Sequence, residues 1–204
     1  MSHPLVSPAV LLDALTGAAV STSSDKNDGI FRAVRLHIED TYLIAESTDR
    51  YCWTRATFGR DEVHSLDVMI DIAEVKRAIQ WIKGLPKGYT DPVSLIVDGR
   101  GLSLQQSDEI VSLNAFTSEI RFPKWSQIVP FEFPATFSNN FIRFNPELLA
   151  KLAKMPRDKR NGFVDIGFST EHRAALARWK TDSIEWQYLV MPIRVTPETT
   201  HYEF

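Results

Sequence analysis

Basic side chains recur at helical spacing in two stretches of the chain. Lys76, Gln80 and Lys83 are four and three residues apart, so they share one face of a helix, away from Val75 and Ile79. Cationic groups in such a row can contact the phosphates of a nucleic acid without reading its bases. The plain alternative is that they only keep an amphipathic helix soluble. The residues predicted to face phosphate are Lys76, Arg77, Lys83, Lys87, Lys151, Lys154, Arg157, Lys159 and Arg160.

Residue patterns typical of an enzyme active site do not occur in the sequence. The phosphate-binding loop, the G-x-S-x-G elbow and the H-E-x-x-H zinc motif are all absent. The single cysteine, Cys52, lies inside a predicted strand beside Tyr51 and Trp53, where a structural cysteine is the ordinary case, and the five histidines show no metal-ligand spacing. We therefore expect no catalytic residue, no metal site and no cofactor. An enzyme ranks third, far behind two non-enzymatic interpretations.

The composition is that of an ordinary folded protein. The 204 residues are 44% hydrophobic and 24% charged, which is enough to build a sizeable core. A net charge of −3 argues against a basic coat over the whole surface, although it allows a local basic face. Apolar runs stay well below the ~18 residues of a membrane span, and no signal-peptide pattern opens the sequence. We expect a cytoplasmic protein with no membrane segment.

A unit of roughly sixty residues, read as strand, helix and three strands, occurs three times. Helix starts are predicted at Ser7-Pro8, at Asp71 and at Asn145-Pro146, where a capping side chain precedes an apolar periodic run. The expected class is α+β, with three βαβββ half-units whose helices cover one face of antiparallel sheets. We predict two units in residues 1–120, a proline-rich linker in 121–139, and a third unit with a tail in 140–204. The leading strand of that third unit is predicted at FIRF, residues 141–144, and its last strand runs through YLVMPIRV, residues 188–195.

Three short motifs occur in one order along the chain: IAESTDRYCW at 44–53, RFPKWSQIVP at 121–130 and YLVMPIRV at 188–195. Together they resemble the bacterial sliding clamp, the beta subunit of DNA polymerase III, and therefore imply the DNA-clamp fold. The match covers one full middle domain and the second half of the last domain, as in a shortened clamp, with a phage as a candidate source. One departure is clear, because the family has Gly-His-Arg-Leu where this chain has Arg50 to Trp53.

The resemblance implies a processivity factor, a ring that encircles double-stranded DNA without sequence preference. It also implies a hydrophobic cleft that binds peptides from DNA polymerase and the clamp loader. For Leu189 and Met191 the alternative is ordinary core packing, and for Pro123 and Ile128 it is a linker anchored on the core. The cleft residues that the resemblance implies are Thr48, Arg50, Tyr51, Trp53, Pro123, Ile128, Leu189, Met191, Pro192 and Ile193.

The resemblance also carries an expectation about assembly. Rings of the family close with twelve half-units, so a chain with three of them needs four copies. We accordingly expect a homotetramer in which third units pair across a two-fold axis. The competing interpretation is a clamp-like adaptor or decoy that binds replication proteins without encircling DNA.

Overall fold

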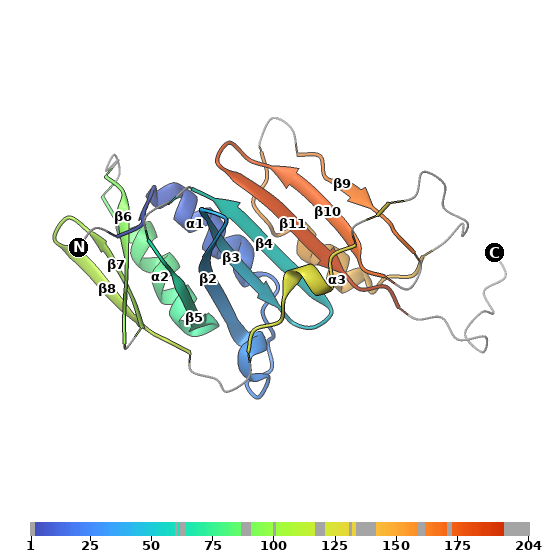
Figure 1. The fold of residues 1–204 in the computed structure, drawn as a ribbon, viewed down its shortest axis with the longest axis horizontal. Coiled ribbons are helices and arrows are strands. Elements are labelled where there is room, and N and C mark those ends of the chain that lie inside the picture. The colour runs from blue at the N-terminus through green and yellow to red at the C-terminus, as the bar shows by residue number, and fades with distance from the viewer. Residues whose placement is uncertain are drawn as a thin grey trace.

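The computed structural model describes residues 3–59, 61, 64–86, 91–99, 101–116, 121–130, 132–133, 142–158, 162–170 and 173–193. Among them, no helix is both long and apolar enough to cross a membrane. The elements, shown in Figure 1, are β1 (Leu5–Val6), α1 (Pro8–Ala19), a 3-10 helix (Gly29–Arg32), β2 (Ala33–Glu39), β3 (Tyr42–Thr48), β4 (Cys52–Phe58), β5 (Asp67–Asp71), α2 (Ile72–Gly84), β6 (Val93–Asp98), β7 (Gly101–Gln106), β8 (Glu109–Asn114), a second 3-10 helix (Trp125–Gln127), α3 (Pro146–Leu152), β9 (Asp165–Gly167), β10 (Ala175–Lys180) and β11 (Ile184–Val190).

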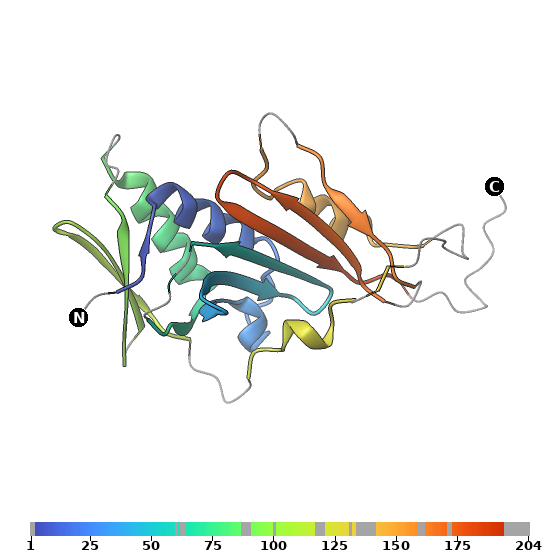
Figure 2. The ribbon, with the colours of Figure 1, turned by 45° about the horizontal axis from the view of Figure 1, so that its top comes forward.

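The first two units interlock by exchanging their leading strands. The first unit is β1, α1 and β2–β4, and the second is β5, α2 and β6–β8. Strand β1 pairs with β6 of the second unit, and β5 pairs with β2 of the first. Helices α1 and α2 lie side by side (Figure 2) and bury one shared apolar core. The predicted α+β class with antiparallel sheets is confirmed.

The third unit, α3 with β9–β11, joins the first unit by extending its sheet. Strand β11 pairs antiparallel with β4, from Val190 opposite Cys52 to Ile184 opposite Phe58. The strand order of this sheet is β5-β2-β3-β4-β11-β10-β9, and that of the other is β1-β6-β7-β8. The division into domains therefore stays a prediction, since one sheet spans its proposed boundary.

A glycine in α1 lets this helix pack closely against β11. A Cβ atom added at Gly17 would lie 2.2 Å from two ring atoms of Trp186. That tryptophan is 1% exposed and stacks on Trp179, with ring centroids 5.8 Å apart, so it has little room to move. We expect Gly17→Ala to lower the free energy of unfolding by about 1–3 kcal/mol through overpacking. Urea denaturation measures the change.

The matched control for that substitution is Gly84→Ala at the end of α2. A Cβ atom at Gly84 meets nothing within 4 Å. The control should be neutral or slightly stabilising, because alanine favours helix over glycine by up to ~1 kcal/mol. Equal free energies of unfolding for the two variants would contradict the packing of α1 on Trp186.

Several predicted boundaries are wrong. Residues 142–144 of the predicted FIRF strand form no strand, and residue 141 lies outside the described residues. In the first two units the leading strand adds to the sheet of the neighbouring unit, and no such neighbour faces the third unit among the described residues. The last strand ends at Val190 rather than running through residue 195. Pro192 follows closely and offers no N–H for a further ladder bond.

Candidate functional site

A pocket lies where β4 and β11 meet, at the junction between the first and third units. Its cavity has a volume of about 240 Å³. Four separate segments build it: the 3-10 helix Gly29–Arg32, the β3–β4 hairpin, the segment 121–130 and the end of β11. The lining residues are Phe31, Thr48, Arg50, Tyr51, Cys52, Trp53, Pro123, Ile128, Leu189 and Met191.

Eight of the ten residues predicted for the cleft line this pocket. Pro192 and Ile193, which follow Met191, do not line it. The backbone N–H of Ile193 instead donates to the carbonyl of Arg143 at 2.8 Å. The sequence interpretation missed Phe31, which comes from a 3-10 helix that no motif marks. It also assigned Cys52 only a structural role.

The turn between β3 and β4 is held by its own side chains. Thr48 Oγ1 donates to the carbonyl of Cys52 at 2.8 Å and accepts from the N–H of Arg50 at 3.1 Å. Asp49 Oδ1 accepts from the N–H groups of Tyr51 and Cys52 at 2.9 and 2.8 Å. These bonds keep Arg50 at a φ of 79°, a left-handed conformation that costs a residue with a side chain about 1–2 kcal/mol. The pocket rim therefore carries a guanidinium at a backbone position that glycine would occupy without this strain.

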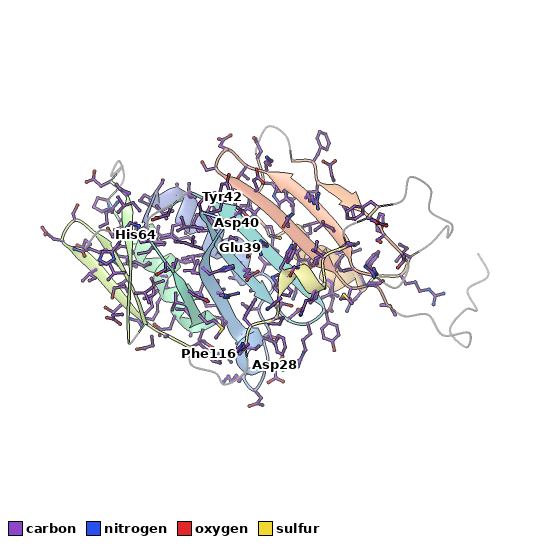
Figure 3. The ribbon with its side chains drawn as sticks, viewed as in Figure 1. Asp28, Glu39, Asp40, Tyr42, His64 and Phe116 are labelled. Atoms are coloured by element: carbon purple, nitrogen blue, oxygen red, sulfur yellow. The ribbon has the colours of Figure 1, made fainter. Side chains whose placement is uncertain are left out.

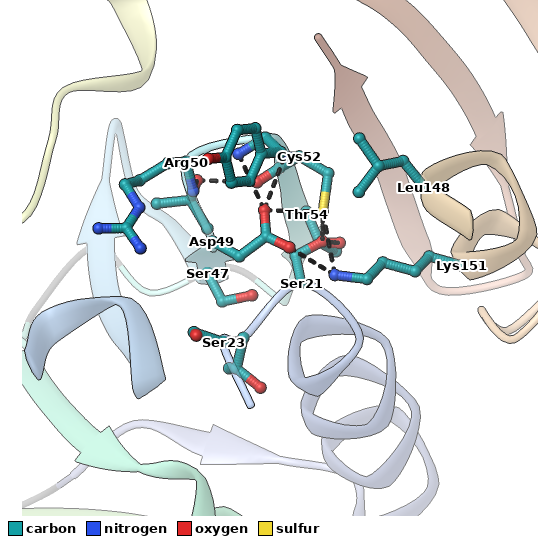
Figure 4. A network of polar contacts seen from close by, with 12 residues as sticks. Ser21, Ser23, Ser47, Asp49, Arg50, Cys52, Thr54, Leu148 and Lys151 are labelled. Carbon is teal, nitrogen blue, oxygen red and sulfur yellow. Dashed lines mark hydrogen bonds and ion pairs between the residues drawn. The ribbon is translucent and has the colours of Figure 1, made fainter. Parts of the chain in front are cut away.

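Helix α3 is tied to the same turn through Lys151 (Figure 4). Its Nζ donates to Asp49 Oδ2 at 2.5 Å and lies 3.5 Å from Cys52 Sγ. Burial alone would raise the pKa of Asp49, but the hydrogen bonds from Lys151 and the Cys52 N–H outweigh it and lower that pKa. Burial raises the pKa of the Cys52 thiol. Tyr188 adds a second tie by donating to the carbonyl of Leu148 at 2.6 Å.

Lys151 was predicted to face DNA, and that role stays a prediction. Its side chain is 23% exposed, and its ammonium is committed to Asp49. Its position holds α3 against the turn that carries Arg50 and Tyr51. No local pattern indicates this ion pair, because its partners lie about a hundred residues apart and in different units.

Aromatic rings fasten the segment 121–130 over the sheet. Trp53 contacts Phe122 and Trp125 edge to face, with ring centroids 5.5 Å apart in both pairs. The guanidinium of Arg55 lies 5.7 Å from the Trp125 ring, and that of Arg35 lies 5.9 Å from Phe122. Each such cation–π contact stabilises by about 0.5–2 kcal/mol. Part of the predicted linker thus lines the pocket, through Pro123 and Ile128.

A buried carboxylate organises the two arginines beneath that wall. The side chain of Glu46 is 2% exposed and lies 3.4 Å from Arg35, 3.6 Å from Arg55 and 2.9 Å from His37. Because a buried charge without partners is costly, this cluster fixes both guanidinium groups in place. The aromatic wall above them therefore has a rigid support.

The rim of the pocket carries one further cation. The Arg50 guanidinium lies 4.7 Å above the ring of Phe31 and pairs with Asp28 at 2.8 Å. Asp28, labelled in Figure 3, lies near the 3-10 helix at the start of β2. Apolar walls with one oriented cation suit a short peptide with apolar side chains and a polar group. No cluster of potential metal ligands occurs among the described residues.

The remaining basic residues of the predicted DNA-facing set are exposed where they are described. Arg77 pairs with Glu74 at 2.7 Å within α2, and Arg157 donates to the carbonyl of Ala153 at 2.8 Å. The exposed members are Lys76, Arg77, Lys83, Lys154 and Arg157. Lys87, Lys159 and Arg160 lie outside the described residues. Exposed cations on α2 and after α3 can make weak phosphate contacts, and their role stays a prediction.

Comparison of the whole chain with solved structures reveals its fold. The beta subunit of DNA polymerase III from Thermotoga maritima superposes with a TM-score of 0.78 at 13% identity, over 96% of this chain and 66% of that one. The chain has the sliding-clamp fold. The DNA polymerase sliding clamp of Pseudomonas aeruginosa gives a TM-score of 0.76 at 11% identity, over 95% of this chain and 67% of that one. The Streptococcus pyogenes beta subunit gives 0.77 at 10% identity, over 96% and 66%.

This likeness extends to fold and not to sequence. No family model and no curated protein matches the chain. The chain spans about two thirds of the length of the clamps that it superposes on. The sliding-clamp fold thus agrees with the resemblance drawn from the three motifs. The formation of a ring, the binding partners and the contact with DNA need separate tests.

Proposed function

We propose that the chain is a subunit of a sliding clamp, a non-enzymatic processivity factor that encircles duplex DNA and tethers replication proteins. The observation that supports this most is the pocket between the first and third units. Segments far apart in the sequence bring Trp53, Pro123 and Met191 together there, on a fold shared with sliding clamps. Because residues of two units are needed to form this pocket, it is better support for a binding site than a surface hollow formed by chance.

The expected ligand is a short linear peptide of the Q-x-x-hydrophobic-hydrophobic type from a polymerase or clamp loader. Leu189, Met191 and Ile128 supply apolar contact, and methionine adapts its shape to differing side chains. Arg50 at the rim can donate a hydrogen bond to a polar group or a backbone carbonyl of the peptide. A contact of this size should bind with a Kd of ~1–100 μM.

Encircling DNA requires a closed oligomer, for which we propose a homotetramer. Helices α2 and α3 would then face the DNA with exposed cations such as Lys76, Lys83 and Lys154. The competing adaptor without a ring is favoured by α1, which carries no basic residue. Both candidates use the same pocket.

Two measurements separate these functions. Fluorescence anisotropy with a labelled Q-x-x-hydrophobic-hydrophobic peptide tests the pocket, and co-elution with nicked circular DNA tests the ring. A clamp should bind the peptide and stay on circular DNA until a restriction enzyme linearises it. Peptide binding without retention would favour the adaptor, and failure of peptide binding would contradict both.

A further inference from the structure

The third unit exposes side chains at positions that the other two units bury. Counting from the helix N-caps Ser7, Asp71 and Asn145, the fourth residue onward is Leu11 in α1, Val75 in α2 and Leu149 in α3. Leu11 and Val75 are both 0% exposed, whereas Leu149 is 41% exposed. The first two helices bury this position because they pack on each other. Among the described residues, helix α3 has no packing against another helix as extensive as that between α1 and α2.

The sheet of the third unit also exposes an apolar side chain at a position that another unit buries. The β3–β4 and β10–β11 hairpins match in length, with Thr48 opposite Trp53 and Lys180 opposite Glu185. When the two hairpins are aligned, each residue of β9 corresponds to the residue of β2 that holds the same place beside its hairpin. By this alignment Asp165 corresponds to Arg35, and Ile166 corresponds to Leu36. Leu36 is 1% exposed, but Ile166 is 45% exposed at the free edge of β9.

The chain itself contains the arrangement that would cover this surface. In both interlocked units, the residue before the helix N-cap pairs with an equivalent strand position: Val6 with Val93, and Ile70 with Val34. One residue earlier, Met69 lies opposite Arg35. The corresponding leading segment of the third unit is Ile142–Phe144, which precedes the N-cap Asn145.

We infer that the third unit docks on the third unit of a second copy by exchanging this leading segment. Transferred to the third unit, the register places Phe144 of one copy opposite Val164 of the other, Ile142 opposite Ile166, and Arg143 opposite Asp165. Apolar residues thus meet apolar residues, and a cation meets a carboxylate directly across the strands. The contact pairs segment 142–144 with the free edge of β9 in antiparallel orientation.

A second copy fits this surface because the contact is self-complementary. Both halves of the interlocked pair hold the same elements, so two identical units related by a two-fold axis can each supply what the other needs. The Arg143–Asp165 pair then forms twice, and Leu149 of each copy is covered by α3 of the other. An uncovered edge with exposed Ile166 and Phe163 would otherwise be an aggregation hazard. This docking specifies one contact of the proposed homotetramer, on which it rests only for the number of copies.

Charge reversal and exchange in the full chain test the register. Multi-angle light scattering should show an assembly at a multiple of the 23.2 kDa chain mass. At a concentration between the dissociation constants of wild type and variant, Arg143→Asp and Asp165→Arg should each halve that mass, because like charges then oppose one another twice per contact. The dissociation constant should rise on the order of tenfold. The double variant Arg143→Asp/Asp165→Arg should restore the assembly.

Two further variants test whether the effect is specific to this contact. Leu149→Asp changes an exposed side chain of the isolated chain, so folding should survive while association is lost. Lys180→Asp removes an exposed charge on β10 that pairs with Glu185 at 2.5 Å, and it should leave the mass unchanged. A wild-type chain that stays at 23.2 kDa, or single variants that associate like wild type, would overturn the inference. Peptide binding by the dissociated variants should persist, so loss of assembly and loss of the proposed pocket are distinguishable.

Discussion

Replacing Met191 with aspartate should abolish peptide binding while the chain stays folded. Met191 lies beyond the end of β11 on the pocket wall, half-buried, and its N–H donates to the carbonyl of Tyr51 at 2.8 Å. An aspartate keeps that backbone bond. Its carboxylate, however, loses hydration when an apolar side chain of the peptide covers it. The dissociation constant should rise at least about a hundredfold, equivalent to roughly 2.7 kcal/mol.

Ile193→Asp provides the matched control for this experiment. Ile193 was predicted to belong to the cleft, yet it is 49% exposed and does not line the pocket. Anisotropy titrations should therefore give a wild-type dissociation constant for this variant. If Met191→Asp binds the labelled peptide as tightly as the control does, the peptide site lies elsewhere.

Reversing the charge at Lys76, Lys83 and Lys154 should sharply reduce retention on circular DNA and leave peptide binding intact. All three side chains are exposed, on α2 and just after α3. Each phosphate contact that is lost should change the slope of log affinity against log salt by about 0.9. Lys151 is left out of the set, because its removal would release Asp49 in the pocket turn.

A triple variant with the same net charge separates location from overall repulsion. Lys26, Lys124 and Lys180 are exposed lysines outside α2 and α3. Changing them to glutamate should preserve most DNA retention over a salt titration. Equal losses in the two triple variants would mean that only net charge matters, and the DNA-facing assignment of α2 and α3 would fail.

Much of the pocket was predictable because its residues belong to short motifs. Thr48, Trp53 and Met191 come from such stretches, and strand pairing brings these stretches together. The contacts that were missed depend on long-range packing. Lys151 looked like any lysine on a helix face, and only the docking of α3 on the β3–β4 turn gives it a carboxylate partner.

The predicted strand at 141–144 shows a different limit. It precedes a helix as the leading strands of the other two units do, but a strand needs a neighbouring edge, and that edge is absent among the described residues of one chain. A local pattern can therefore predict a strand that only an assembly would form. Conversely, the segment 121–130 looked like a linker because of its prolines, although its aromatic rings anchor it firmly over Arg35 and Arg55.

The two outer edges of the fold differ from each other, and this difference determines how neighbouring copies can be oriented in any ring. One end is the free helix and β9 edge of the third unit; the other is the edge strand β8 of the second unit. Within the chain, the last strand of the first unit, β4, pairs with the last strand of the third unit, β11. By the same rule, β8 as the last strand of the second unit can pair with β8 of another copy, and the third unit can pair with the third unit of another copy. Each copy must then be inverted relative to its neighbours, and a closed ring needs an even number of copies. Such a ring has no front or back, so its pockets would open toward both directions along the DNA.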